Sequence, residues 1–69
     1  MNYNYEIVDE IYNGEYCIMA RTFIDGKEYA LETTIAIEHT ELQKEIASDF
    51  VLSKLKEELK IIMSKESKL

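Results

Sequence analysis

Two short turn motifs are the feature that most constrains the fold of this chain. Its 69 residues contain only two glycines and no proline, and the glycines occur in Asn13-Gly14 and Asp25-Gly26. Both dipeptides favour the two-residue type I′ hairpin turn, because both central positions of that turn need positive φ angles. Strand-like runs flank each turn. They predict an antiparallel three-stranded meander with strands at about 3–12, 15–24 and 27–37.

Turns of fixed length also set the pairing register, so the residues on each face of the predicted sheet can be written out. One face is rich in Ile, Leu and Tyr, with Asp9 as its only acid, and is predicted to form the core. The other face has an apolar central row flanked by acidic residues, an arrangement typical of protein interfaces. Its members, which include a predicted Glu6–Arg21 ion pair, are the candidate partner-binding residues: Glu6, Glu10, Glu15, Cys17, Met19, Arg21, Phe23, Glu28 and Glu32.

A helical pattern replaces the strand pattern from about Thr40. Thr40 and Gln43 fit a capping box, in which each side chain bonds the backbone N–H of the other residue. Nothing before Ser64 interrupts the helix, so we predict a helix at about 40–64 and a short frayed tail at 65–69. At about 1.5 Å per residue this helix is as long as a strand of about ten residues, and it can cover one sheet face. The prediction is a single α+β domain of β-β-β-α order.

The predicted helix has more large apolar residues than one narrow face can hold. They fall into two stripes that lie more than about 90° apart around the helix axis, namely Leu42, Ile46 and Phe50, and then Leu52, Leu55, Leu59 and Ile62. Two explanations stay open. Either the helix bends or breaks near Ser48-Asp49, which are both good N-cap residues, or the second stripe packs on another chain, as its coiled-coil-like spacing indicates. Self-association through the second stripe or through the sheet is therefore an alternative expectation.

Charge is distributed unevenly along the chain. The net charge is −6, and residues 1–38 carry this whole excess, with eight acidic residues against Arg21 and Lys27. Residues 39–69 carry six acidic residues and six lysines. An acidic field disfavours direct binding to nucleic acid or to anionic membranes and favours a basic protein partner.

Compartment can be inferred from what the sequence contains. No apolar run approaches the roughly 20 residues of a membrane span. The polar, acidic N-terminus does not resemble a signal peptide. A single cysteine is typical of reducing compartments, so we expect a cytoplasmic protein.

Few residues could carry chemistry. The only histidine, His39, and the only cysteine, Cys17, form no metal-binding pattern, and the carboxylates around Cys17 should raise its thiol pKa. Acidic pairs are numerous, but a three-stranded sheet with one helix predicts no cleft that would separate their pKa values. We therefore expect no enzyme activity, no metal and no cofactor, and we interpret His39 as a solvated residue at the helix start.

The C-terminal Ser67-Lys68-Leu69 matches a peroxisomal targeting signal. Abundant Ile, Lys, Glu and Tyr, without Pro or Trp, are typical instead of an AT-rich bacterial or phage genome. In such an organism the signal has no meaning.

These surfaces, rather than any catalytic motif, indicate a function. The first hypothesis is a small acidic, non-enzymatic inhibitor or regulator whose sheet face binds a basic surface of a partner protein, such as one that handles nucleic acid. Small acidic phage-encoded inhibitors, such as anti-CRISPR proteins, are similar in size and charge only, and no motif assigns the chain to them. If the chain is phage-encoded, the expected location is the cytoplasm of the bacterial host cell. The second hypothesis is a homo-oligomeric structural or accessory protein that self-associates through its sheet and its helix.

Overall fold

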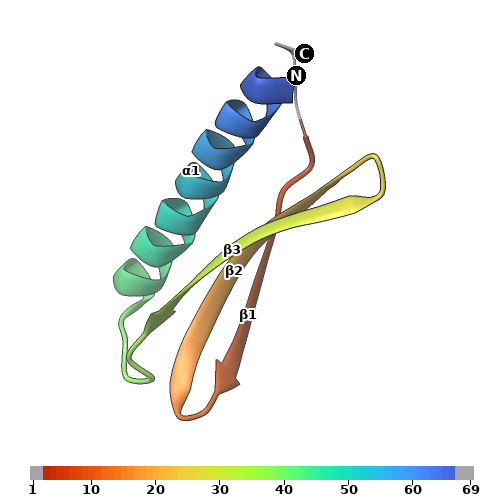
Figure 1. Ribbon diagram of the computed structural model, residues 1–69. Helices are drawn as coiled ribbons and strands as arrows, with labels where there is room; N and C mark the ends of the chain where they lie inside the picture. Colours follow the sequence, from red (N-terminus) through yellow and green to blue (C-terminus); the bar gives the residue numbers. More distant parts are fainter. Residues whose placement is uncertain (1–2, 67–69) are drawn as a thin grey trace.

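The described part of the chain forms a three-stranded antiparallel sheet and one long helix, and Figure 1 shows the helix against a single face of the sheet. The structure is a computed structural model and describes residues 3–66. Its elements are β1 (Glu6–Tyr12), β2 (Glu15–Ile24), β3 (Lys27–Ile35) and α1 (Glu41–Glu66), with β2 in the centre of the sheet. The predicted α+β class and β-β-β-α order are confirmed.

Both hairpins turn as predicted. The central turn residues all have positive φ, with values of 52° at Asn13, 76° at Gly14, 52° at Asp25 and 81° at Gly26. This is the sign that a type I′ turn requires at both positions. The pairing register of β1 with β2 and of β2 with β3 is the predicted one. Glu6 lies opposite Arg21 in the first pair of strands, and Met19 lies opposite Glu32 in the second.

β1 starts later than predicted, at Glu6 rather than at residue 3. A side chain holds the segment before it, since the hydroxyl of Thr22 donates a hydrogen bond to the carbonyl oxygen of Asn4 at 2.7 Å. Thr22 is only 2% exposed, and this bond satisfies its hydroxyl inside the core. Tyr3 and Tyr5, on the same segment, pack at the edge of the core.

The later boundaries also differ from prediction. β3 ends at Ile35, two residues early, whereas α1 runs to Glu66 and so includes the start of the predicted tail. The helical pattern therefore continues past Ser64, where the sequence suggested an end. Ser67-Lys68-Leu69, with its match to a targeting signal, lies outside the described residues.

α1 begins with the predicted capping box and has no break. The Thr40 N–H donates to Oε1 of Gln43 at 2.8 Å, and the Gln43 N–H donates to Oγ1 of Thr40 at 3.1 Å. Ser48 does not cap a new helix, because its hydroxyl donates to the carbonyl oxygen of Lys44 at 2.9 Å. The 26 residues of α1 form one helix of about 39 Å.

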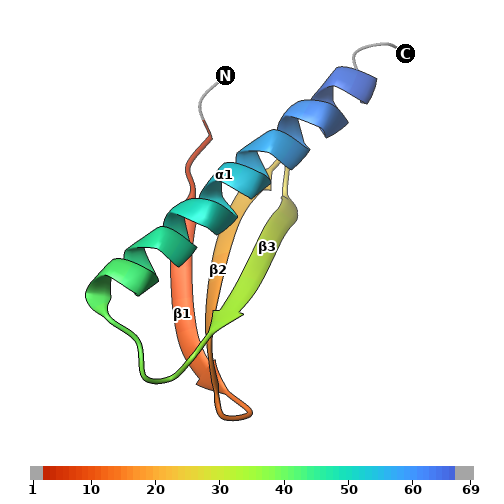
Figure 2. The same cartoon turned by 90° about the vertical axis from the view of Figure 1, so that its left-hand side faces the viewer.

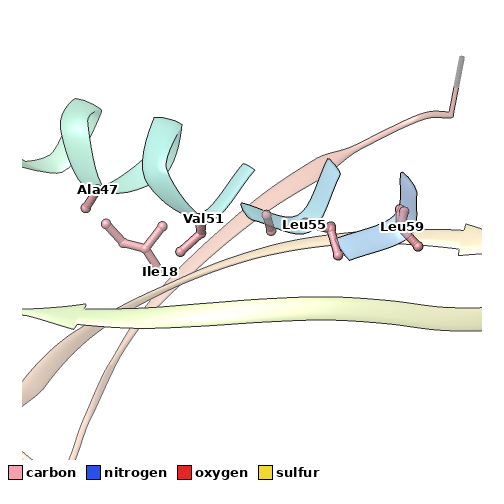
Figure 3. Packing of buried hydrophobic residues seen from close by; sticks show 6 residues of the cluster. Ile18, Ala47, Val51, Leu55 and Leu59 are labelled. Atoms are coloured by element: carbon pink, nitrogen blue, oxygen red, sulfur yellow. The ribbon is translucent and has the colours of Figure 1, made fainter. Parts of the chain in front are cut away.

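The core is one row of helix residues packed on the middle strand (Figure 3). Its sheet members are Ile18 and Ala20, and all six side chains of the cluster are at most 7% exposed. Burial of a large apolar side chain contributes about 1.5–3 kcal/mol. The helix members recur every four residues, at Ala47, Val51, Leu55 and Leu59.

Figure 2 shows α1 running obliquely across the sheet. The helix packs mainly on β2 and β3 rather than on β1. Ile7 and Ile11 of β1 lie opposite Ala20 and Tyr16, on the helix-facing side of the sheet. They are nevertheless 41% and 64% exposed, so the prediction that this whole face is buried is wrong for β1. The reason is width, because one helix of about 10 Å covers only about two strands spaced at about 4.8 Å.

The second helix stripe belongs to the core of its own chain. Leu55 and Leu59 are each 2% exposed, and Leu52 and Ile62 are half-buried beside them. The expectation that this stripe faces another chain is therefore corrected for its two central leucines. Val51 extends the same row toward the helix start. The sequence analysis did not reveal this row, because it grouped only the larger apolar residues into two separate stripes.

The first helix stripe is the exposed one. Leu42, Ile46 and Phe50 are 64%, 60% and 53% exposed. Ala47 takes the place over the sheet that the sequence assigned to these larger residues. The helix thus needs neither a bend nor a break to bury a complete row.

Candidate interaction surfaces

The first candidate surface is the sheet face turned away from α1, which no described element covers (Figure 1). We call it the outer sheet face. On its central strand Cys17, Met19 and Arg21 are half-buried by their neighbours, and Phe23 is 57% exposed. The register brings all nine predicted partner-binding residues to this face, and its five glutamates are all exposed: Glu6, Glu10, Glu15, Glu28 and Glu32.

One basic residue, Arg21, lies within this acidic face. Its Nε and Nη2 donate to the two carboxylate oxygens of Glu6, each at 3.2 Å, so the predicted ion pair is present and bidentate. Hydrogen bonding to Glu6 raises the pKa of Arg21. Its guanidinium also lies 6.0 Å from the ring centre of Phe23. No ion pair within residues 3–66 neutralises the remaining four glutamates, which are Glu10, Glu15, Glu28 and Glu32.

Cys17 is not activated as a nucleophile. Burial raises the pKa of its thiol, and the nearby carboxylates of Glu32, Glu15 and Glu10 raise it further. A raised pKa keeps the thiol protonated and unreactive at neutral pH. His39 packs against Tyr16, on the opposite side of the sheet, so the two residues cannot form a nucleophile–base pair. The described residues also contain no cluster of three or more groups that could hold a metal ion.

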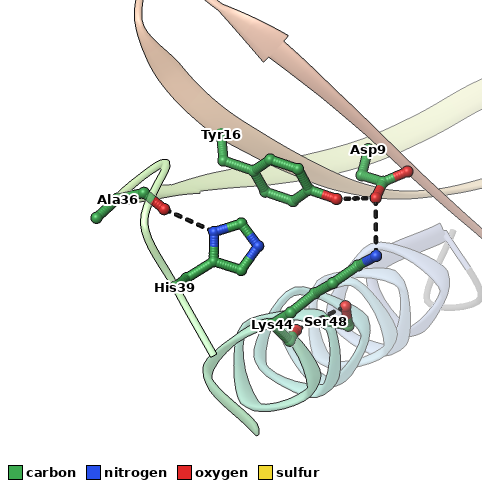
Figure 4. A network of polar contacts seen from close by, with 6 residues as sticks. All are labelled: Asp9, Tyr16, Ala36, His39, Lys44 and Ser48. Atoms are coloured by element: carbon green, nitrogen blue, oxygen red, sulfur yellow. Dashed lines mark hydrogen bonds and ion pairs between the residues drawn. The ribbon is translucent and has the colours of Figure 1, made fainter. Parts of the chain in front are cut away.

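A polar network on the helix-facing side was missed by the sequence analysis (Figure 4). The hydroxyl of Tyr16 donates to the carboxylate of Asp9, and Nζ of Lys44 lies 3.1 Å from the same carboxylate. These bonds lower the pKa of Asp9 and raise the pKa values of Tyr16 and Lys44. The available signal was Asp9 itself, the one acid on the predicted core face, but its partner on the helix was not assigned.

His39 is half-buried rather than solvated, so the interpretation of it as a solvent-facing residue is corrected. Its ring centre lies 4.4 Å from that of Tyr16, and its Nδ1 is 2.7 Å from the carbonyl oxygen of Ala36. The ring therefore packs the loop between β3 and α1 onto the sheet. This role depends on the path of that loop, which no local pattern predicts.

The second candidate surface is an apolar groove of about 450 Å³ between the end of β3 and the first half of α1. Thr33 and Ile35 of β3 line it, together with Ala36 and His39 of the following loop. The helix side consists of Gln43, Ile46, Ala47 and Phe50. Both explanations considered for the two helix stripes left the first stripe, with Ile46 and Phe50, on the sheet of its own chain, and the groove was missed for that reason.

Comparisons of the chain with protein-family models, with curated proteins and with solved structures find no match. The functional argument therefore depends on these two surfaces alone. Within residues 3–66, the single helix does not combine the length and apolar character that crossing a membrane requires.

Proposed function

We propose that this protein is a non-enzymatic inhibitor or regulator that docks its outer sheet face on a basic surface of a partner protein. The observation that carries the proposal is the row of Cys17, Met19 and Phe23, which lies uncovered between exposed glutamates on both neighbouring strands. An apolar centre within a polar rim is the usual anatomy of a protein interface.

Electrostatics supports a basic partner. Five glutamates and one arginine lie on this face, and Arg21 is already paired with Glu6. The remaining carboxylates would attract a basic surface and speed its encounter. Lys- and Arg-rich surfaces are the usual means by which proteins bind nucleic acid, so a nucleic-acid-handling protein is the favoured class of partner. An acidic face that occupies a nucleic-acid-binding surface would mimic the charge of nucleic acid, and such mimicry would be useful to an anti-defence protein of a phage.

The apolar row supports the docking proposal independently of charge. Phe23 is an exposed aromatic side chain, and aromatic residues are among the commonest anchors of binding energy at interfaces. Met19 is flexible and polarizable, and such residues adapt to a partner's shape. Solubility alone would require the glutamates but would not require an exposed Phe23 between them.

Charge-reversal variants test this proposal against a panel of purified basic DNA- and RNA-binding proteins. We expect binding to at least one member, measured by interferometry, to weaken at least about tenfold in Glu10→Lys and in Glu32→Lys. Raising the salt concentration should weaken the wild-type complex as well, because exposed charges are screened.

Glu58→Lys is the matched control, since it makes the same charge change at an exposed position of the helix. It should retain binding and its far-ultraviolet circular dichroism. Equal loss of affinity in all three variants would show that only net charge matters, and the docking proposal would then be wrong. Failure of every panel member to bind would contradict the assignment of the partner class.

A homo-oligomeric structural or accessory role is the second candidate function. It draws support from the groove and from the exposed Ile46 and Phe50 that line it. The groove lies on the helix side of the sheet and the five glutamates of the outer sheet face lie on the other side, so the two roles are physically compatible.

A further inference from the structure

The outer edge of β3 and the groove beside it form one continuous surface on the helix side of the sheet. We propose that a second copy of this chain occupies this surface, with its β3 added antiparallel to this β3 around a two-fold axis. The product is a homodimer with a continuous six-stranded sheet and both helices on the same face. This inference is independent of the proposed partner, which would dock on the opposite face.

β3 is an open edge of the sheet. Within residues 3–66 it pairs only with β2, through an unbroken register of nine residue pairs. Apart from bonds within the helix and the strand pairs, the only backbone hydrogen bond within residues 3–66 joins Lys44 to Thr40. Natural proteins usually blunt such an edge with a bulge, a proline, charged side chains or a covering segment, and β3 carries the charged residues Lys27, Glu28 and Glu32. β3 has no bulge and no proline, so its outer N–H and C=O groups are available to another strand.

The sequence of β3 is compatible with pairing to itself. The middle residue of Lys27–Ile35 is Leu31, and a two-fold axis at Leu31 lets all nine residues pair. In that register Ala30 lies opposite Glu32 of the second copy, and Glu28 lies opposite Thr34 of the second copy. No two glutamates lie directly opposite one another, so the like-charge repulsion of directly opposite cross-strand pairs is avoided.

The backbone geometry permits the same register. In a two-residue hairpin the residues that flank the turn form a hydrogen-bonded pair, and such pairs then alternate along the ladder. By this alternation, starting from the Ile24–Lys27 pair, the odd-numbered residues of β3 bond to β2. The even-numbered residues, from Glu28 to Thr34, direct their N–H and C=O groups outward. Pairing across Leu31 places these even-numbered residues opposite one another.

The other sheet edge is less suitable. β1 covers only Glu6–Tyr12, and its middle residue is Asp9. Full self-pairing of β1 would place Asp9 opposite Asp9 of the second copy, a direct like-charge contact. Asp9 is also already engaged by Lys44 and Tyr16. Self-complementarity therefore selects β3 rather than β1.

The helices of the two copies are also compatible with this dimer. A two-fold axis perpendicular to the sheet keeps both helices on one face and makes them antiparallel. The exposed Ile46 and Phe50 of one copy then face the second half of the other helix. Ile61 lies about three turns after Phe50, on the same side of α1, and it is 47% exposed. None of the residues that line the groove is acidic, so an apolar helix fits it better than a basic peptide.

Solution mass from light scattering tests this inference. The wild type is expected to have twice the mass of one chain at high micromolar concentration, with little dependence on salt. Ile46→Lys should raise the dimer dissociation constant at least about tenfold, because it would bury a charge in an apolar interface. Ile46 is 60% exposed in the single chain, so this variant should still fold.

Ile11→Lys is the matched control, since Ile11 is 64% exposed on β1, away from the proposed interface. It should leave the dimer intact. A wild-type monomer at high concentration would overturn the inference, and so would equal effects of Ile46→Lys and Ile11→Lys.

Amide hydrogen exchange separates strand pairing from a contact between helices alone. In the dimer the outward amides of Ala30 and Glu32 should exchange at least about tenfold more slowly than in Ile46→Lys at a concentration at which light scattering shows that variant to be monomeric. A dimer in which these amides exchange as fast as those of an open edge would overturn the β3 register. Neither measurement uses a basic partner, so failure of the dimer and failure of the proposed function can be distinguished.

Discussion

At the scale of single residues, Asp9 shows how one side chain joins two elements. It binds Tyr16 on the neighbouring strand and Lys44 on the helix (Figure 4). These bonds lower the pKa of Asp9 below its ordinary value of 3.8. Ionised Asp9 therefore stabilises the fold. Its contribution is fully present above pH 3.8 and is lost as the pH falls through the lowered pKa.

Replacement of Asp9 by Asn is expected to lower the urea midpoint at about pH 6, because Lys44 loses its charged partner. The gap between Asp9→Asn and wild type should close as the pH falls below 3.8, since wild-type Asp9 is then protonated as well. Circular dichroism at each pH provides the midpoints. An exposed helix carboxylate variant, Glu58→Gln, should show no such gap at about pH 6. A constant gap between Asp9→Asn and wild type down to about pH 2 would contradict this role.

At the scale of elements, α1 is held by its buried row rather than by its largest side chains. Leu55→Ala is expected to destabilise the protein by about 2–5 kcal/mol, because it removes a buried side chain and leaves a cavity. Leu42→Ala makes the same chemical change at a position that is 64% exposed, and it should change stability by less than about 0.5 kcal/mol. Urea denaturation of both variants at equal concentration checks the difference. Similar losses in the two would mean that the helix is rotated from the orientation described.

The same elements show what a sequence can and cannot predict. The turns at Asn13-Gly14 and Asp25-Gly26 and the cap at Thr40 were predicted correctly, because each depends only on neighbouring residues. The buried side of α1 was not predicted correctly, because it depends on the angle at which the helix crosses the sheet. Ala47 and Val51 lie in the core, although larger residues nearby seemed the better candidates.

At the scale of the whole molecule, the sheet separates two surfaces of different chemistry. The outer sheet face was foreseeable from sequence, since type I′ turns fix the register that gathers Cys17, Met19 and the glutamates. The groove was not foreseeable, because Ile46 and Phe50 line it only if the helix buries its other side. A homodimer through β3 would place two acidic faces side by side and would present a larger surface to a basic partner.

The most direct test of the central claim is to map the partner's contact site on the protein. Amide chemical shifts would be recorded on isotope-labelled protein with and without the panel protein that binds most tightly. The account predicts changes at Cys17, Met19 and Phe23 and at the neighbouring glutamates of β1 and β3, with little change along the second half of α1. Changes confined to the helix or to the groove, with the outer sheet face unaffected, would contradict it.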